Sequence, residues 1–384
     1  MIIAQKNEKK NFIRFSEKSK NKIQQLIEKN SISRNYGIDL LKIISMINII
    51  NLHINNHTAQ LKLNPKNPKY KSVYLLHTFS FFPVNTFGFI SGIIGYKKYK
   101  FVNIIYLWFE YLFYSVILSL FLYYKSIANF KSIILSFFPL GIVRHWYANA
   151  YILMYLFLPF ITISINLLDK KLFFKIIICY FLIYSVYHTI IQLNINNTNF
   201  DFISGGYSSL WLLILYIVGG YLGKFVINCF SFSIFNILFI LIYFIISFIT
   251  FECTINDKIK NKFTNRALLK YFSPTIVIQA LSLIFFFSNL KITNKYLIKL
   301  ILFLNPLNFN VTLIHARAFY FKIPIINKFY KFIKSMDSKY LFFKIYGSSI
   351  LIYFICAFID YFRYIIFKIF KIRNICNLIE KKIF

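Results

Sequence analysis

Acidic residues are scarce in this chain of 384 residues, which has 12 Asp and Glu against 45 Lys and Arg and a formal net charge of +33. A balance this basic is typical of proteins that bind nucleic acid or acidic membranes. The lysines fall in short clusters between apolar runs and form no basic helix or stacking surface on a soluble module, which argues against nucleic acid. We therefore expect anionic lipid headgroups, and no nucleic acid, as the counter-charge.

Cysteine and internal repetition are also limited. The five cysteines, at positions 179, 229, 253, 356 and 376, include no Cys-x-x-Cys pair and no metal-ligand spacing. This argues against a disulfide framework and a zinc site, and favours small core residues. The chain has no repeat of fixed period and no inverted pair of broken helices, features typical of secondary transporters. Residues 1–34 are basic and lack a continuous apolar stretch, so we expect no cleavable signal peptide.

Long apolar runs dominate what is present. Hydrophobic residues make up 58% of the chain and aromatic residues 21%, which indicates an all-α, polytopic membrane protein. At about 20 apolar residues per span, we expect about ten transmembrane helices. Segment 133–147 is interrupted by Pro139, Gly141, Arg144 and His145, and is predicted to be re-entrant or interfacial. The predicted spans are 38–57, 74–96, 102–123, 148–167, 172–191, 208–224, 232–251, 274–290, 298–316 and 345–367.

These spans divide the chain into three predicted parts. A basic N-terminal tail occupies residues 1–35, a transmembrane domain residues 36–371, and a short C-terminal tail residues 372–384. An even number of spans places both tails on one side of the membrane. The basic leader ahead of the first span predicts that this side is the cytoplasm.

The first predicted span contains a lysine and a histidine. Lys42 and His53 are 11 residues apart, which returns the side chain to within roughly 20° of the same helix face, about 16 Å further along the axis. Ionisable groups at bilayer depth usually face a protein interior or a wet cavity, so this stripe is a candidate functional site. Alternatively, Lys42 forms a structural ion pair with Asp39. His53 and His57 have a metal-ligand spacing, but without a third ligand nearby we expect no metal site.

A second constellation lies in residues 83–100. Asn85, Ser91 and Gly92 interrupt an apolar helix that is followed by three lysines at 97, 98 and 100. The small residues permit close helix approach, and lysines at a helix end are ordinary cytoplasmic anchors. The same lysines also suit a diphosphate.

A third constellation joins residues 144–160 with residues 205–225. Its aromatic residues are predicted to lie at the outer boundary, where aromatic belts are common. The alternative is a platform on which a carbohydrate stacks, with polar groups fixing its orientation. The residues are Trp146, Tyr147, Tyr151, Tyr207 and Trp211.

Several short segments follow one another in an order typical of one family. These are GIDLLKIISM with ten residues between Lys42 and His53, VNTFGFISG followed by YKKYK, HWYANAYILMYLFLPF, GYSSLWLLILYIVGGYL, LIH ending at His315, and FIDYFR. In this order and spacing the chain resembles the acyltransferase-3 family of bacterial integral-membrane O-acyltransferases. The likeness runs from about residue 34 to 372 and is strongest to members encoded with capsule or exopolysaccharide pathways.

The resemblance implies a ten-helix enzyme of the bacterial cytoplasmic (inner) membrane. Such an enzyme takes an acyl group, usually acetyl, from cytoplasmic acyl-CoA and delivers it to a hydroxyl of a surface glycan or its lipid-linked precursor. Acetyl-CoA is then a co-substrate, and no cofactor is bound permanently. The implied partners are the glycan acceptor, anionic lipids and polysaccharide-assembly proteins.

The resemblance also implies roles on the donor side. The basic-x10-His signature of the family falls on Lys42 and His53, and His53 is expected to act as the base or as a transient acyl carrier. Lys42 would stabilise negative charge at the thioester. The twin-arginine pattern of the family falls on Lys97 and Lys100, which together with Lys98 would hold the CoA phosphates. Lysine supplies the charge without the planar fork of arginine.

Further residues are expected along the path of the acyl group. Ser91, Asn85 and Tyr151 would line the passage, and Arg144 and His315 would contact the acceptor near the outer face.

Other interpretations fit part of the same pattern. Intramembrane Lys and His are also expected in a transporter or flippase for a small solute or lipid-linked sugar. A non-catalytic subunit of a polysaccharide-assembly complex is a third possibility. Asp360 and Arg363, three residues apart in the last span, are expected to form a structural ion pair.

Overall fold

A computed structural model of the chain describes residues 34–56, 68–97, 99–140, 146–194, 203–227, 233–259, 264–320 and 338–383. The chain divides into two units, Met1–Asn35 and Tyr36–Phe384. Only Arg34 and Asn35 of the first unit are described. Within the described ranges the second unit contains helices and connecting turns, with no strand, so the all-α prediction is confirmed.

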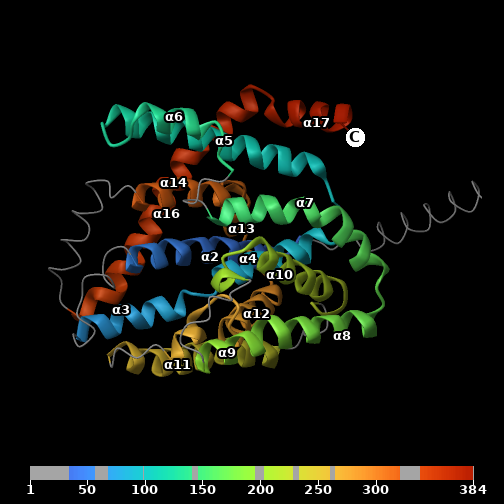
Figure 1. Ribbon diagram of the computed structural model, residues 1–384, viewed down its shortest axis with the longest axis vertical. Helices are drawn as coiled ribbons and strands as arrows, with labels where there is room; N and C mark the ends of the chain where they lie inside the picture. Colours follow the sequence, from blue (N-terminus) through green and yellow to red (C-terminus); the bar gives the residue numbers. More distant parts are fainter. Residues whose placement is uncertain are drawn as a thin grey trace, which may run out of the picture. The chain divides into compact units, whose positions relative to one another are not determined.

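The helices keep the labels of Figure 1. In chain order they are α2 (Tyr36–Ile54), α3 (Pro68–Phe79), α4 (Pro83–Gly95), α5 (Phe101–Tyr124), α6 (Phe130–Ser136), α7 (Trp146–Leu167), α8 (Lys170–Tyr180), η3 (Phe181–Tyr187), α9 (His188–Asn194), η4 (Ser204–Gly206), α10 (Ser209–Tyr221), η5 (Leu222–Val226), α11 (Ser233–Ile259), η6 (Thr264–Leu269), α12 (Pro274–Ser288), α13 (Lys295–Leu304), η7 (Asn305–Leu307), α14 (Asn308–Tyr320), α16 (Ser338–Ile369) and α17 (Ile372–Ile383).

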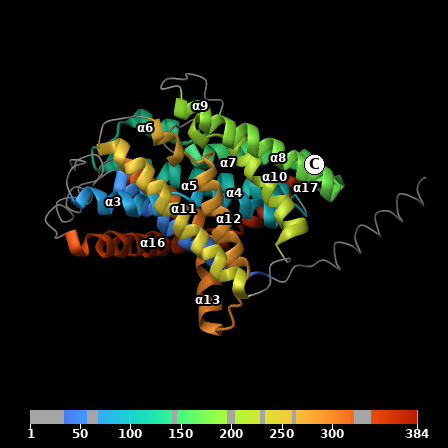
Figure 2. The ribbon, with the colours of Figure 1, turned by 90° about the horizontal axis from the view of Figure 1, so that it is seen from below.

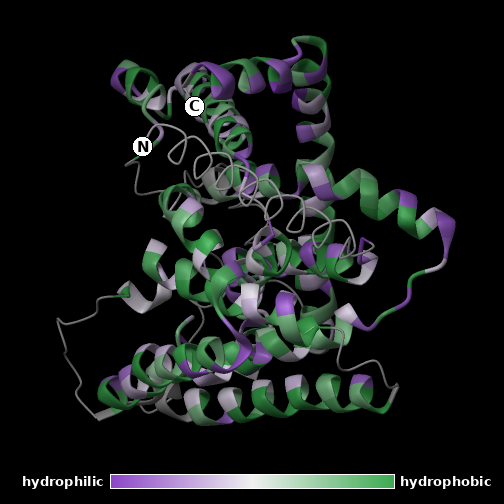
Figure 3. Ribbon diagram, turned by 90° about the vertical axis from the view of Figure 1, so that its right-hand side faces the viewer, coloured by the Kyte–Doolittle hydropathy of each residue, from purple (hydrophilic) through white to green (hydrophobic). Residues whose placement is uncertain are grey.

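The expectation of ten membrane spans is confirmed. Among the described residues, 10 helical segments are long and apolar enough to cross a bilayer. The largest shift is at the start of the eighth span, which begins at Ala267 instead of residue 274. Helices satisfy their own backbone hydrogen bonds, which is why such runs form helices in lipid. Figure 3 shows that hydrophobic residues occupy most of the helical ribbon.

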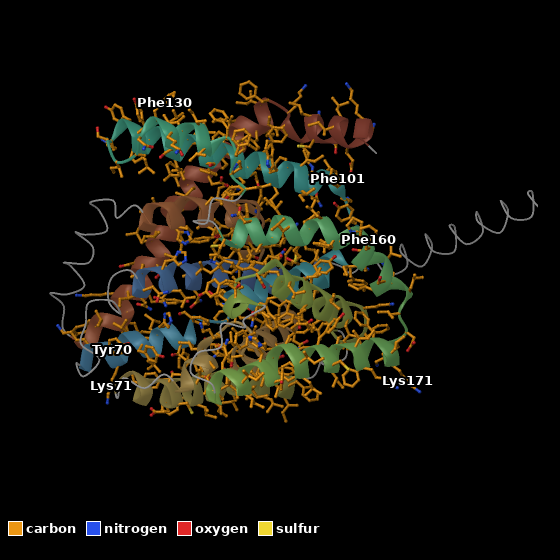
Figure 4. All side chains as sticks on the ribbon, viewed as in Figure 1. Tyr70, Lys71, Phe101, Phe130, Phe160 and Lys171 are labelled. Atoms are coloured by element: carbon orange, nitrogen blue, oxygen red, sulfur yellow. The ribbon has the colours of Figure 1, made fainter. Side chains whose placement is uncertain are left out.

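Helix ends alternate between opposite ends of the bundle. Figure 4 places Tyr70 and Lys71, near the start of α3, at one end, and Phe101 and Lys171, near the starts of α5 and α8, at the other. This arrangement is expected for successive spans that cross in opposite directions.

The two helices that carry Lys42, His53 and Ser91 belong to the most buried spans among the described residues. The first two spans, which contain α2 and α4, are 72% buried, whereas the fifth is 11% and the seventh 22% buried. Helix α2 packs against α4, α12, α14 and α16 and lies among the other helices in Figure 1. Helices α11 and α12 pack side by side, as Figure 2 shows. The polar stripe of α2 therefore lies inside the protein instead of facing lipid.

Helices α4 and α10 cross at backbone contact. A Cβ atom built on Gly92 would lie 2.0 Å from the carbonyl oxygen of Tyr216, and one on Gly219 would lie 2.1 Å from that of Phe89. Only glycine permits this approach. The predicted packing role of Gly92 is thus confirmed.

The predicted Asp360–Arg363 pair is present and is part of a larger buried cluster. Arg363 donates from Nε and Nη2 to the two oxygens of Asp360 at 2.9 and 2.7 Å. Its Nη1 lies 2.8 Å from Oε1 of Glu110 on α5. Tyr114 on α5 and Asn310 on α14 donate to Asp360 at 2.7 and 3.4 Å. The cluster ties α5, α14 and α16 together.

Two segments outside the predicted spans also take a defined form. The interrupted segment near 133–147 includes the end of the short helix α6 and contains no membrane-length helix in its described residues. The predicted C-terminal tail forms helix α17, which packs on α5. At 12 residues, this helix is too short to span a bilayer.

Candidate functional site

Lys42 and His53 each line a cavity. Lys42 borders a cavity of about 560 Å³, here called the lysine cavity. His53 borders a second cavity of about 240 Å³, here called the histidine cavity. Nζ of Lys42 lies 2.9 Å from Oδ1 of Asp39, so the structural ion pair considered from the sequence is also present. Pairing uses one of the three ammonium N–H groups and leaves two for other acceptors.

The two cavities adjoin along α2. Ile49 of α2, Tyr147 of α7, and Phe309 and Thr312 of α14 contribute to the walls of both. These four side chains lie between the two cavities and contact both. Since Ile49 lies between Lys42 and His53 on α2, the stripe predicted from the sequence follows the path from one cavity to the other.

The lysine cavity brings together several residues that are far apart in the sequence. Ser91 of α4 donates to the carbonyl of Phe87 at 2.8 Å, and its Oγ lies 3.3 Å from the hydroxyl of Tyr151 on α7. Both line the cavity, as expected for passage residues. Asn308 of α14 also lines this cavity and donates to the carbonyl of Lys42 at 2.8 Å. No sequence motif marks Asn308.

The three candidate phosphate-binding lysines differ in position. Lys100 lines the lysine cavity at the start of α5. Lys97 is described but is not part of this lining, and Lys98 lies outside the described residues. Beside Lys100, burial and, to a smaller extent, the Glu380 carboxylate raise the pKa of Tyr99 to about 12. The Tyr99 hydroxyl therefore stays protonated near neutral pH and can donate a hydrogen bond into the cavity.

His53 is paired with a second histidine. The ring centroids of His53 and His315 are 5.0 Å apart, and the ring planes are inclined by 45°. His315 is buried on α14, and its Nδ1 lies 2.5 Å from the carbonyl oxygen of Val311. The structure thus brings two predicted site residues from opposite ends of the sequence together. Two imidazoles at this distance can bind and relay a proton.

Aromatic rings form much of the remaining wall of the histidine cavity. Trp146 lies 4.6 Å from Tyr207 and 6.0 Å from Tyr271, centroid to centroid, and Tyr271 stacks on Phe81 at 4.8 Å. All four rings line the cavity. Tyr147 also lines it, whereas Trp211 does not. Trp146 and Tyr207 belong to the aromatic residues predicted from the sequence, whereas Tyr271 and Phe81 carry no local motif.

A tight turn places Tyr207 against Tyr271. Gly205 and Gly206 have φ angles of +68° and +89°, which favour glycine. The amide of Tyr271 donates to the carbonyl of Gly205 at 3.2 Å. Burial raises the pKa of Tyr207 above its ordinary value, so this hydroxyl also stays protonated.

Asn85 has a structural position instead of the predicted place in the passage. Its Nδ2 donates to the carbonyl of Tyr271 at 2.7 Å, and its Oδ1 accepts from Nε1 of Trp211 at 3.0 Å. It is fully buried and lines neither cavity. Asn85 joins α4 to α10 and to the segment before α12, and so supports the aromatic wall indirectly.

Two other predicted positions, Arg144 and His57, lie outside the described residues. Within the part of the chain that is described, no group of three or more His, Cys, Asp or Glu side chains is placed to hold a metal ion.

No protein-family model, no curated protein and no solved structure matches this chain. The acyltransferase-3 resemblance therefore stays a prediction from the motifs quoted above. What the geometry offers is a cationic cavity and an imidazole-bearing aromatic cavity that meet inside one bundle.

Proposed function

We propose that this protein is a membrane O-acyltransferase that moves an acyl group, most simply acetyl, from acyl-CoA to a hydroxyl of a surface polysaccharide or its lipid-linked precursor. The observation that carries the proposal is the arrangement on α2. Lys42 and His53 line adjoining cavities that share Ile49, Tyr147, Phe309 and Thr312. A cationic donor site and a basic acceptor site that share a wall suit the transfer of a small group between two large substrates.

The donor is assigned to the lysine cavity. Lys100 and Lys42 supply positive charge for the phosphates or the thioester end of acyl-CoA, and Tyr99 and Tyr151 supply hydroxyls. Lys97 lies three residues before Lys100 in the sequence and extends the basic character of this region. Acyl-CoA is made in the cytoplasm, so this assignment places the lysine cavity and both chain ends on the cytoplasmic side of the inner membrane.

The acceptor is assigned to the histidine cavity. Rings such as Trp146, Tyr207 and Tyr271 offer apolar faces on which a sugar can stack, and the tyrosine hydroxyls can fix its orientation. His53 then lies in the wall beside the acceptor hydroxyl.

The chemistry follows from these positions. His53 accepts the proton of the acceptor hydroxyl while its oxygen attacks the thioester carbonyl. The C–S bond breaks, the CoA thiolate leaves, and the proton held by His53 passes to that thiolate, which regenerates the neutral imidazole. The ring of His315, tilted beside that of His53, helps to orient it. The Lys42 ammonium, held in place by Asp39, lies about 16 Å from His53 along α2, so it serves the donor side and holds negative charge of acyl-CoA there.

The test is acetyl transfer by the purified full-length protein in proteoliposomes. Radiolabelled acetyl-CoA is supplied with polysaccharide from a deletion strain, and O-acetyl groups are measured by proton NMR. We expect His53→Ala to abolish transfer, while a control at another histidine, His188→Gln, retains it. If His53→Ala acetylates normally at equal protein level, the assigned base is wrong.

Transport is the second candidate, because two adjoining cavities also fit a permeation path. The same proteoliposomes separate the two functions. A flippase moves its substrate without acetyl-CoA and leaves it unmodified, whereas the enzyme releases free CoA in step with new ester. A missing O-acetyl product together with substrate movement would favour transport.

A further inference from the structure

The C-terminal helix α17 has an unusual combination of charge and position. It follows the last span directly, after a turn in which Lys371 has a φ of +50°. One flank of α17 is buried, since Cys376 is 0% exposed. Another flank exposes Ile375 and Leu378, at 41% and 59%. Polar residues fill the rest of its surface. An amphipathic helix next to a membrane span is typical of segments that lie in the lipid headgroup region.

Helix α17 is anchored to the first turn of α5. Oε1 of Glu380 accepts the backbone N–H of Val102 at 3.0 Å. The residue at the start of that helix, Lys100, provides no side-chain cap of its own, so Glu380 satisfies a free N–H and places negative charge at the positive end of the helix dipole. Arg373 donates to the side chain of Asn103 at 2.6 Å.

The basic residues in and before α17 have few acidic residues near them in the sequence to neutralise their charge. Glu380 is the only acidic residue between positions 361 and 383, and it is committed to α5. Lys381 and Lys382 follow it directly in the sequence, Lys368 and Lys371 lie shortly before α17, and all four lysines are exposed. The phosphate groups of anionic phospholipids attract exposed lysines, and the acyl chains beneath them accommodate the exposed apolar side chains.

We propose that α17 binds anionic phospholipid headgroups through Lys381 and Lys382, with Ile375 and Leu378 entering the lipid. Because Glu380 and Arg373 connect α17 to the first turn of α5, lipid binding also reduces the local opening of that first turn. Lys100 and Asn103 of the same turn line the lysine cavity. This lipid site does not depend on the enzymatic function proposed above, and its test needs no activity measurement.

The test titrates phosphatidylglycerol into mixed micelles of the full-length protein and phosphatidylcholine, with bound lipid counted by native mass spectrometry. At about 5-fold in affinity per basic residue near the surface, Lys381→Gln with Lys382→Gln should weaken phosphatidylglycerol binding about 30-fold. The matched control is Lys170→Gln with Lys171→Gln, a pair of exposed lysines at the start of α8. The control should retain most of the affinity. Equal losses in the two double variants, or no loss in either, would overturn the proposal.

Two further arms identify the ligand and the connection to α5. Inorganic phosphate at matched concentration should not displace the lipid, and displacement would assign a simple anion site instead.

Hydrogen exchange of Val102 and Asn103 should be slower in phosphatidylglycerol nanodiscs than in phosphatidylcholine nanodiscs, and the lysine double variant should lose this difference. Glu380→Gln should keep the lipid affinity but exchange faster at Val102 in both lipids. Exchange that is independent of lipid in the unmodified protein would refute the connection.

Discussion

The crossing of α4 and α10 allows a quantitative test of the fold. A Cβ atom on Gly92 would lie 2.0 Å from the carbonyl oxygen of Tyr216 and 2.7 Å from the backbone nitrogen of Gly220. Ordinary contact begins at 3.4 Å, so Gly92→Ala requires a separation of about 1.4 Å (3.4 minus 2.0) at this point. The obstructing atoms are backbone, and a side-chain rotation cannot relieve the clash. The two helices must therefore move apart.

This movement has a definite cost. Overpacking of a close-packed site costs about 1–3 kcal/mol, occasionally more. Replacing glycine by alanine inside a helix returns only about 0.5–1 kcal/mol. We expect a net loss of stability, measured as a fall in the melting temperature of the detergent-purified protein. Gly347→Ala is the matched control, because nothing lies within 4 Å of its added Cβ, and its melting temperature should be unchanged or higher.

A double variant sharpens the test. Gly219 lies at the same crossing, with its built Cβ 2.1 Å from the carbonyl oxygen of Phe89. Once one alanine has separated the helices, the second should add little, so Gly92→Ala with Gly219→Ala should be less destabilised than the sum of the single changes. Strict additivity, or a Gly92→Ala protein as stable as the unmodified one, would refute the close crossing.

Three further substitutions test buried polar contacts by the same melting assay. Asp360→Ala leaves Arg363 without its bidentate partner, and loss of one member of a buried pair costs about 3–5 kcal/mol. Lys224→Met removes a half-exposed ammonium that donates to three carbonyls at the end of α7 at 2.9 to 3.0 Å, and should cost about 1 kcal/mol, because water can replace part of these bonds. Asn85→Leu leaves the indole N–H of Trp211 unpaired and should cost about 1–3 kcal/mol, without changing the acetyl-CoA dependence of any activity.

Each of these three has a result that contradicts it. An Asp360→Ala protein that melts normally would mean that Glu110 alone compensates Arg363. Unchanged stability of Lys224→Met would mean that the α7 carbonyls find other donors. If Asn85→Leu needed a different concentration of acetyl-CoA, Asn85 would act as a passage residue, as predicted from the sequence.

Local sequence patterns were sufficient to predict the membrane spans and the ion pairs within one helix. Apolar runs gave all ten spans, because a helix in lipid must be long and apolar whatever it packs against. The i, i+3 pairs of Asp39 with Lys42 and of Asp360 with Arg363 are fixed by helix geometry alone. The shared face of Lys42 and His53 follows from the same geometry.

Contacts between distant segments could not be predicted in this way. Asn85 meets the backbone of Tyr271, 186 residues later, and no local pattern in the sequence indicates the partner. His315 was predicted to contact the acceptor near the outer face, but its ring contact with His53 depends on how α14 packs against α2. Helix α17 was missed because its amphipathic pattern is short and its partner, α5, lies far away in the sequence.

Polar residues on α2 explain why this helix is the centre of the proposed site. Asn48 and Asn51 bond to Tyr346 and Ser80 at 3.4 and 2.6 Å, so these two polar groups serve packing. Lys42 and His53 differ from them because their side chains border cavities. A purely structural α2 would bury both as it buries the two asparagines, since a cavity beside a charged group forfeits packing. Open space kept next to these two side chains is thus better explained by a substrate than by stability.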